Sequence, residues 1–517
     1  MKKAGLLLVL IMSVVMLPSC NNSNNNGKDR EVTLYAMNDF HGAAVYNKSS
    51  SELGILKQGT FFKQKGKEKN TLILNSGDMW QGSIESNLNY GQFLTEVMNT
   101  VEFDCFTLGN HEFDWGAEYI TKNMNLKDSD TNYQTPFLAS NIYHFDRENL
   151  IVKDHADELG QEYVVKNLEN GLKVGIIGII GTNQITSITS GFVDSYVFLD
   201  PESIITRLSD KLRTEENVDV VVVDAHSSAD EMLAECVGIT NISNKSNKRY
   251  VDAVFCAHSH QYEASEYNGV PFVQSGCNGR GYSEISLSVD KDGEVSLVTN
   301  NNHRSNTSEI RNITSYDSKI ESLYEKYTSE TKDIGCKVLA NINGTLSQAD
   351  YSGDGTKAIL PNLVSKAIAL EAISQGYEID LAMCNKSRSS IGPGTITYSD
   401  LYKALPFNNE IYVINAKGSD IINEAQYNSI CCINPDLIES NKYYKVAVID
   451  YLATHRNVFR IYDYFTDFEI LGKLTKEGSE FYNYRDITAD YLLKQEGTIN
   501  ASDYTTKGQF VLNYVQE

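Results

Sequence analysis

Five apolar, strand-like runs in the first 300 residues each end in aspartate, asparagine or histidine side chains. Strands that alternate with helices form layered α/β domains, and ligands in such sheets gather at the carboxyl ends of the strands. An imidazole beside a buried strand is costly unless a partner or a metal ion satisfies it. The pattern therefore predicts a layered α/β domain with a metal site at one edge. The polar residues after the five runs are Asp39 and His41, Asp78, Asn110 to Asp114, His226, and His258 with His260.

The spacing of apolar residues between these loops predicts the other elements of the domain. Asp200 is a good N-cap and Pro201 suits the first helical position, so a helix is predicted from there to residue 217. Further helices are predicted over 53–65 and 91–101. Strands are predicted over 31–37, 71–74, 103–108, 136–141, 172–181, 218–223, 251–256 and 270–276, with a hairpin over 284–299.

The length of 517 residues, 41% of them hydrophobic, predicts two or more domains. Residues 300–306 are polar and predict a boundary loop, and residues 316–332 have the apolar spacing of a linking helix. Beyond them, a helix is predicted over 363–372 and a strand over 443–449. The predicted divisions are a signal peptide at 1–20, a flexible tether at 21–30, a first domain at 31–300, a linker with a helix at 301–334, and a second domain at 335–517.

The N-terminus has the pattern of an export signal. Two lysines precede a short apolar run at residues 4–17, which is too short to span a membrane. The run ends in Leu17-Pro18-Ser19-Cys20, an ending that resembles the bacterial lipoprotein box, in which Cys20 becomes the lipid-modified N-terminus. The prediction is an exported bacterial lipoprotein, periplasmic or on the cell surface and anchored to the membrane by that lipid. Ordinary signal-peptide cleavage is the alternative.

The formal net charge of −23 argues against a polymeric nucleic acid as partner, because an acidic protein repels a phosphate backbone. A small phosphate substrate needs positive charge that is concentrated locally. The sequence therefore favours a small molecule as the substrate.

Seven of the side chains that follow the strands offer oxygen or nitrogen ligands, enough for two metal ions if one carboxylate bridges them. Mixed imidazole and carboxylate ligation suits zinc, manganese or iron better than calcium. The choice among these three metals stays open. The seven residues are Asp39, His41, Asp78, Asn110, His226, His258 and His260.

Four motifs closely resemble those of the calcineurin-like metallophosphoesterases, specifically their secreted 5′-nucleotidase branch. They are N-D-F-H-G at 38–42, G-D-M-W-Q-G-S at 77–83, G-N-H-E-F-D-W-G at 109–116 and A-H-S-H at 257–260. The resemblance implies a four-layer α/β/β/α sandwich with Asp78 as the bridge between two metals. It also implies that His111 is the catalytic acid or transition-state stabiliser and that Asp114 orients it. The implied ligands are Asp39, His41, Asp78 and His260 for one metal, and Asp78, Asn110, His226 and His258 for the other.

The second half resembles the substrate-binding domain of the same enzymes, an α+β domain. The matching segments are N-K-S-R at 385–388, G-T-I-T at 394–397 and L-P-F-N-N at 405–409. The resemblance implies that Asn385 and Arg388 hold polar groups of the substrate, and that Phe407 and Phe459 sandwich a base.

The predicted reaction is hydrolysis of a nucleoside 5′-phosphate to nucleoside and phosphate outside the cytoplasm. Segments 385–388 and 455–459 differ from the family pattern, and they motivate a second hypothesis in which the substrate is a 2′,3′-cyclic nucleotide, a nucleotide sugar or a sulfur ester. A third is a non-catalytic surface lipoprotein that binds a ligand or partner. The complete ligand set, together with His111 and Asp114, argues against that third hypothesis.

Overall fold

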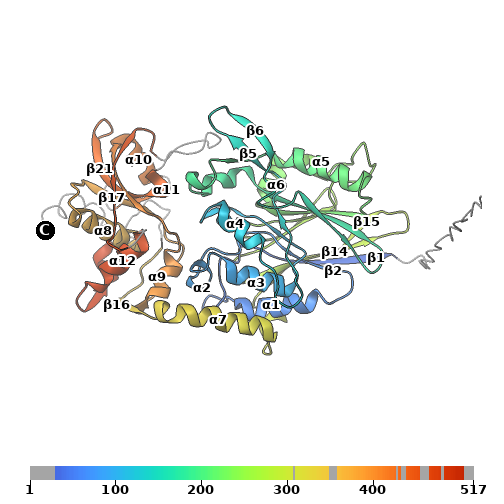
Figure 1. Cartoon of the computed structure of the whole chain (residues 1–517), viewed down its shortest axis with the longest axis horizontal. Helices are drawn as coiled ribbons and strands as arrows, with labels where there is room; N and C mark the ends of the chain where they lie inside the picture. The colour runs from blue at the N-terminus through green and yellow to red at the C-terminus, as the bar shows by residue number, and fades with distance from the viewer. Residues whose placement is uncertain are drawn as a thin grey trace, which may run out of the picture.

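The computed structural model describes residues 29–306, 309–348, 358–426, 429–431, 438–453, 465–478 and 482–505. In Figure 1 the described chain forms two domains that lie side by side, the first at the right and the second at the left. The predicted roles of Cys20 and Phe459 lie outside the described residues. Among the described residues, no helix is long and apolar enough to cross a membrane.

Two six-stranded sheets form the centre of the first domain. In spatial order the first contains β15 (Val295–Arg304), β14 (Gly281–Val289), β1 (Arg30–Met37), β2 (Thr71–Asn75), β3 (Cys105–Thr107) and β4 (Phe137–Leu138). The second contains β12 (Tyr262–Tyr267), β13 (Val270–Ser275), β11 (Ala253–Phe255), β10 (Val220–His226), β8 (Lys173–Ile180) and β7 (Tyr163–Asn167). A small third sheet contains β6 (Ile151–His155), β5 (Ile142–Asp146) and β9 (Tyr196–Phe198).

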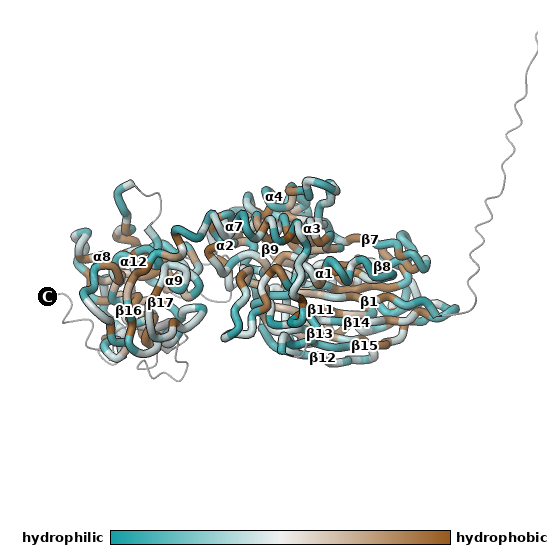
Figure 2. Tube along the Cα trace, turned by 90° about the horizontal axis from the view of Figure 1, so that it is seen from below, coloured by the Kyte–Doolittle hydropathy of each residue, from teal (hydrophilic) through white to brown (hydrophobic). Residues whose placement is uncertain are grey.

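The two large sheets pack face to face because each presents an apolar surface to the other. Figure 2 shows apolar segments along these strands. The central strands of both sheets are parallel, so their carboxyl ends lie at one edge. One buried cluster joins the sheets and includes Leu34, Leu72 and Leu74 from the first and Val174, Ile176 and Val222 from the second.

Helices cover the outer faces of both sheets and complete the four predicted layers. α1 (Gly54–Lys65) and α3 (Gln92–Val101) cover the first sheet, and α2 (Ile84–Asn87) and α4 (Ala117–Met124) pack against α3. α5 (Pro201–Thr214) and α6 (Ala229–Glu235) cover the second. The predicted start of α5 is confirmed, because the Asp200 side chain accepts from Ser203 N at 2.9 Å. The predicted α/β sandwich is therefore observed.

Helix α7 (Ser318–Gly335) lies between the domains along the bottom of Figure 1 and packs against α1, α2 and α3. Asp317 caps it by accepting from Lys319 N at 3.1 Å. The helix predicted over 316–332 is thus confirmed. The loop predicted over 300–306 is wrong for its first five residues, because β15 continues to Arg304 and pairs with β14 as far as Gly281. This edge strand tolerates polar residues since one face meets solvent.

The second domain is a smaller α/β unit with two sheets. Its five-stranded sheet contains β20 (Ser429–Cys431), β17 (Leu381–Asn385), β21 (Tyr443–Ile449), β19 (Ile411–Lys417) and β22 (Phe468–Lys473). A three-stranded sheet contains β18 (Gly394–Thr397), β16 (Val338–Asn343) and β23 (Thr498–Asn500). The helices are α8 (Ile359–Ser374), α9 (Tyr398–Ala404), α10 (Gly418–Gln426), α11 (Asp450–Ala453) and α12 (Tyr484–Leu493).

Candidate metal centre

The loops that leave β1, β2, β3, β10 and β11 meet at the carboxyl edge of the two sheets. His41 and Asp78 come from the first sheet, and His226 and His258 come from the second. All seven predicted ligands lie here; five are buried, and His258 and His260 are partly exposed. The structure thus brings together every one of the seven residues.

The backbone at this edge is strained. Five of the seven residues have positive φ angles, in the region that side chains other than glycine rarely adopt. Such conformations persist only where the surrounding structure holds them, and they cluster at functional sites. The loops are therefore shaped to aim particular side chains at one place. The five are Asp39 (φ 46°), His41 (φ 49°), Asp78 (φ 54°), His258 (φ 71°) and His260 (φ 60°).

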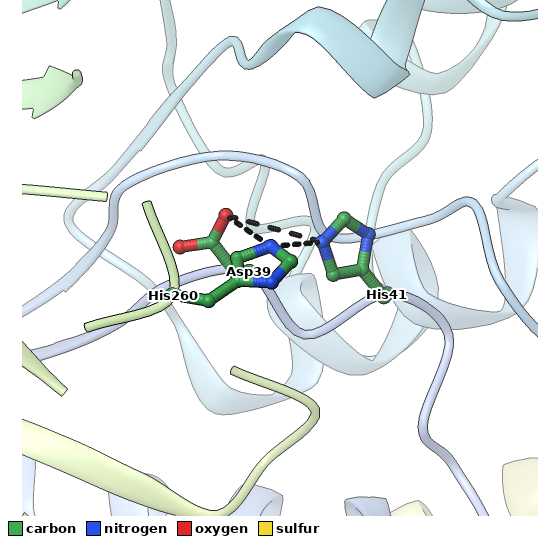
Figure 3. Close-up of side chains that lie close together, drawn as sticks. All are labelled: Asp39, His41 and His260. Carbon is green, nitrogen blue, oxygen red and sulfur yellow. Dashed lines mark hydrogen bonds and ion pairs between the residues drawn. The ribbon is translucent and has the colours of Figure 1, made fainter. Parts of the chain in front are cut away.

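The first cluster consists of Asp39, His41 and His260, shown in Figure 3. Nε2 of His260 lies 3.4 Å from Oδ1 of Asp39, and Nε2 of His41 lies 3.9 Å from the same oxygen. The two Nε2 atoms are 3.0 Å apart. Metal–ligand bonds of about 2.0–2.2 Å place neighbouring ligand atoms roughly 3–4 Å apart, so these spacings suit one ion.

The second cluster consists of Asp78, His226, His258 and Asn110. Nε2 of His226 lies 3.2 Å from Oδ2 of Asp78 and 3.1 Å from Oδ1 of Asn110. Nδ1 of His258 lies 3.0 Å from the same Asn110 oxygen. Oδ2 of Asp78 is also 3.8 Å from Nε2 of His41, so this carboxylate faces both clusters.

The donor chemistry of the clusters fits metal ions. Nδ1 of His226 donates to the Ser76 carbonyl at 2.9 Å, so Nε2 faces the oxygen atoms of Asp78 and Asn110 and can bind a metal there once it is deprotonated. Nδ1 of His41 faces the Gln81 carbonyl at 3.3 Å, which directs its Nε2 lone pair toward Asp39 and Asp78. Carboxylate, amide and imidazole atoms that converge in this way are the donor set that zinc, manganese or iron binds. The two clusters together form a candidate dinuclear site.

The electrostatics of the clusters are those of tightly coupled opposite charges. Burial alone would raise the pKa of the Asp78 carboxyl, but the His226 and His111 imidazoles outweigh it and hold that pKa well below its usual range. Burial likewise lowers the pKa of His226, yet the Asp78 carboxylate reverses this and raises it to about 9. For His258, burial and the nearby His226 together lower the pKa to about 4. The carboxylates therefore stay ionised and available to a metal.

Glu112 has no role among the residues predicted from the sequence, yet it holds together the loops that carry the candidate ligands. Its Oε2 accepts from Asp78 N at 2.9 Å and Gly109 N at 2.8 Å, and its Oε1 accepts from Met79 N at 2.9 Å. Burial first, and the Asp78 charge second, raise the pKa of Glu112 to about 7. One sequence feature could have indicated this role: Glu112 is a carboxylate in the turn directly after the buried strand β3.

Asn38 and Gly77 were also missed, and both constrain the ligands. The Asn38 amide donates to Asp39 Oδ2 at 2.7 Å and to the Gly276 carbonyl at 2.7 Å, so it fixes the first carboxylate. A Cβ on Gly77, whose φ is +93°, would lie 2.7 Å from both Gly109 N and His226 Nδ1. Only glycine allows the loops to approach this closely.

His111 and Asp114 form a pair beside the two clusters. Nδ1 of His111 lies 2.7 Å from Oδ2 of Asp114, and both side chains are largely buried. The backbone N–H of His111 donates to Oδ1 of Asp78 at 2.9 Å, so the same loop is tied to the shared carboxylate. Asp114 therefore sets the orientation of the imidazole and leaves Nε2 facing Oδ2 of Asp78, 4.0 Å away.

Arg388 and Phe407 reach this centre from the second domain. Nη2 of Arg388 lies 3.3 Å from Nε2 of His111 and 3.4 Å from Nε2 of His41. The ring centroids of Phe407 and His111 are 5.5 Å apart, with an angle of 30° between the ring planes. Arg388 therefore supplies local positive charge in a chain of net charge −23. Asn385, the last residue of β17, is half-buried three positions before Arg388.

Comparison with known proteins agrees with this arrangement. Residues 32–262 match the family model of the calcineurin-like phosphoesterases, and residues 337–424 match that of the 5′-nucleotidase C-terminal domain. The chain belongs to the 5′-nucleotidase family, with a calcineurin-like phosphoesterase domain and a C-terminal 5′-nucleotidase domain. The enzyme thus has the two domains that its motifs indicated.

Proteins similar in sequence to the enzyme are named for different activities, among them a nucleotidase and an endonuclease. It is 25% identical to the 5′-nucleotidase of Bos taurus over 76% of this chain and 70% of that protein. It is 26% identical to Endonuclease YhcR of Bacillus subtilis (strain 168), over 75% of this chain but only 32% of that protein. Among solved structures, a 5′-nucleotidase precursor from Thermus thermophilus has a TM-score of 0.67 at 18% identity, covering 91% of this chain and 99% of that one. That likeness confirms the fold.

Proposed function

We propose that the enzyme hydrolyses nucleoside 5′-phosphates to a nucleoside and inorganic phosphate. The observation that carries this proposal is the position of Arg388 and Phe407, a cation and an aromatic ring, directly against His41 and His111. A cation suits the phosphate, and a ring beside it suits the base. Hydrolysis at such a site requires the two domains together.

The seven ligands would hold two divalent ions, zinc, manganese or iron, which when bound supply Lewis acidity that activates water and screens the phosphate charge. Water adds its oxygen to phosphorus while the bond from phosphorus to the 5′ oxygen breaks; the phosphate keeps one of the water's protons, and the other replaces the proton that His111 gives up. His111 would give a proton from Nε2 to the departing oxygen, and the Asp114 carboxylate at Nδ1 would stabilise the protonated ring. Arg388 would bind a phosphate oxygen through Nη2.

A substrate panel tests this proposal directly. The purified, metal-loaded enzyme should release phosphate from AMP and other nucleoside 5′-phosphates faster than from 2′,3′-cyclic nucleotides, nucleotide sugars or sulfur esters. DNA and RNA belong in the panel because one relative is named an endonuclease. The charge of −23 predicts that neither polymer is cleaved efficiently. Preference for a cyclic nucleotide, nucleotide sugar or sulfur ester would replace the proposed substrate.

We further propose that the enzyme works outside the cytoplasm, anchored by a lipid on Cys20. The support is the sequence pattern of residues 1–20, with the polar tether 21–30 behind it. Replacing Cys20 by Ala should move the protein from the membrane fraction to the soluble fraction, with the activity of the folded domains unchanged. Tight association of this variant with membranes in detergent-free fractions would show a different anchor.

A further inference from the structure

Arg485, the second residue of α12, is a buried arginine whose hydrogen bonds converge on one loop. The residue is only 3% exposed. Nη1 donates to the carbonyls of Leu405 and Phe407, each at 3.0 Å, and Nη2 donates to Oδ1 of Asn408 at 2.9 Å. This loop, residues 405–408, carries the ring that lies against His111.

The remaining surroundings of Arg485 are aromatic. Its guanidinium carbon lies 3.7 Å from the ring centroid of Tyr402, and Nε lies 3.3 Å from the hydroxyl of Tyr398, which in turn donates to Asp486 at 2.5 Å. Within the described ranges, no carboxylate forms an ion pair with Arg485. Burying a cation without such a pair is costly. The loop carbonyls and the ring face of Tyr402 offset that cost, so the guanidinium and the loop fix each other.

The pattern of carbonyls in the loop explains why one guanidinium can hold it. The first and third carbonyls of the loop accept hydrogen bonds on one side, and the second accepts a hydrogen bond on the other. The Leu405 and Phe407 carbonyls meet Arg485 inside the second domain. The Pro406 carbonyl instead accepts from Nδ2 of Asn87, in the first domain, at 3.1 Å. The loop is therefore held from both sides, and the rigid fork of Arg485 sets its direction.

We propose that Arg485 is a positioning residue for substrate recognition: it fixes the loop 405–408 so that Phe407 meets the base of the substrate. The proposal rests on the base-binding role given to Phe407 in the proposed function. Arg485 touches no reacting atom. Its effect is on how tightly nucleotides bind rather than on the chemical step.

The test compares two full-length variants, Arg485→Lys and the matched control Arg213→Lys. Lysine keeps the charge but has a single ammonium group that cannot reproduce the planar fork. Arg213 is also a buried arginine, 8% exposed, but it lies in the first domain and bonds to Asp252 at 2.5 Å and to the Asp219 carbonyl. The control therefore measures the general effect of replacing a buried arginine. The readouts are amide hydrogen exchange of residues 405–409 without substrate, and KM and kcat for AMP and for ribose 5-phosphate, which lacks a base.

Arg485→Lys should speed exchange in the loop and raise KM for AMP at least about fivefold, the low end for a lost stacking contact. KM for ribose 5-phosphate and kcat for both substrates should change little. Arg213→Lys should not reproduce this split and should leave the exchange of residues 405–409 unchanged. Equal rises in KM for both substrates, or a loss of stability with normal exchange in the loop, would overturn the proposal.

The two readouts separate this proposal from the proposed function. If the wild-type enzyme hydrolyses no nucleoside phosphate, the proposed function fails, while exchange in the loop still decides whether Arg485 positions it. If Arg485→Lys does not fold, Asn408→Ala removes one loop contact from an exposed side chain and should raise exchange in the same direction by less. Unchanged exchange in Asn408→Ala would then overturn the positioning role.

Discussion

Nη2 of Arg388 lies 3.3 Å from Nε2 of His111, although 277 positions separate the two residues and they belong to different domains. The contact puts a permanent positive charge beside the proposed proton donor. A phosphate bound beside this contact would meet both groups at once. The second domain therefore places a cation directly against the candidate metal centre of the first.

Arg388→Ala should lower kcat/KM by about 10- to 150-fold, because a hydrogen bond to a charged group contributes about 1.5–3 kcal/mol. The loss should be similar for AMP and for ribose 5-phosphate, since both present the same phosphate. Steady-state kinetics measure this. The control is Arg147→Ala, which removes an exposed arginine paired with Asp194 at 2.7 Å on the first domain. Normal kcat/KM in Arg388→Ala would show that Arg388 does not contact the phosphate.

Asp78→Asn should lose at least one metal ion and nearly all hydrolysis. Its Oδ2 lies 3.8 Å from Nε2 of His41 and 3.2 Å from Nε2 of His226, so both clusters depend on this carboxylate. Elemental analysis of the purified variant, beside an activity assay, gives the answer. Asp157→Asn, which changes an exposed carboxylate paired with His155, should keep both metals. Two metals with near-normal turnover in Asp78→Asn would exclude a bridging role.

The ligands could be predicted from the sequence because each follows an apolar strand within a few residues. Parallel strands deliver such residues to one edge whatever the details of the loops. Glu112 could not be assigned in the same way. Its carboxylate accepts from the backbone of Asp78 and Met79, which belong to a different strand and loop, and a sequence does not show which backbone groups approach a side chain.

The second domain was harder to predict for the same reason. Arg485 lies in a helix near the end of the chain, and its partners are backbone carbonyls at Leu405 and Phe407, which leave no trace in residue type. The segment 300–304 shows the opposite difficulty. Its polar residues suggest a loop, yet backbone pairing with β14 makes it a strand. Local propensity was overridden there by pairing within the sheet.

His111→Ala should retain both metals, because Asn110 rather than His111 lies within the second cluster. Turnover should fall by roughly 10²–10⁴-fold, as expected for a lost general acid. Nitrophenyl phosphate has a better leaving group than AMP and should lose less activity. The control His144→Ala removes a half-exposed imidazole paired with Glu158 and should be neutral for turnover. Equal losses on both substrates would argue against protonation of the leaving group.

Base recognition is tested by shortening the aromatic side chains of the second domain. Phe407 lies half-buried with its ring 5.5 Å from that of His111, and Phe459 is its partner by sequence resemblance alone. Replacing either by Ala should cost about 1–3 kcal/mol of nucleotide binding, which appears as an increase of KM for AMP. Ribose 5-phosphate should be nearly unaffected, because the metals and His111 lie in the other domain.

The control for this experiment is Phe468→Ala, which shortens a partly buried ring packed on the core of the same domain. It should lower the melting temperature without changing KM for AMP, because its contacts are with the domain core. The comparison therefore separates loss of a base contact from loss of packing. If Phe407→Ala and Phe459→Ala both leave the KM for AMP unchanged, the second domain does not clamp a base. The segments 385–388 and 455–459 would then indicate a substrate without one, and the sulfur esters in the panel would be the first to examine.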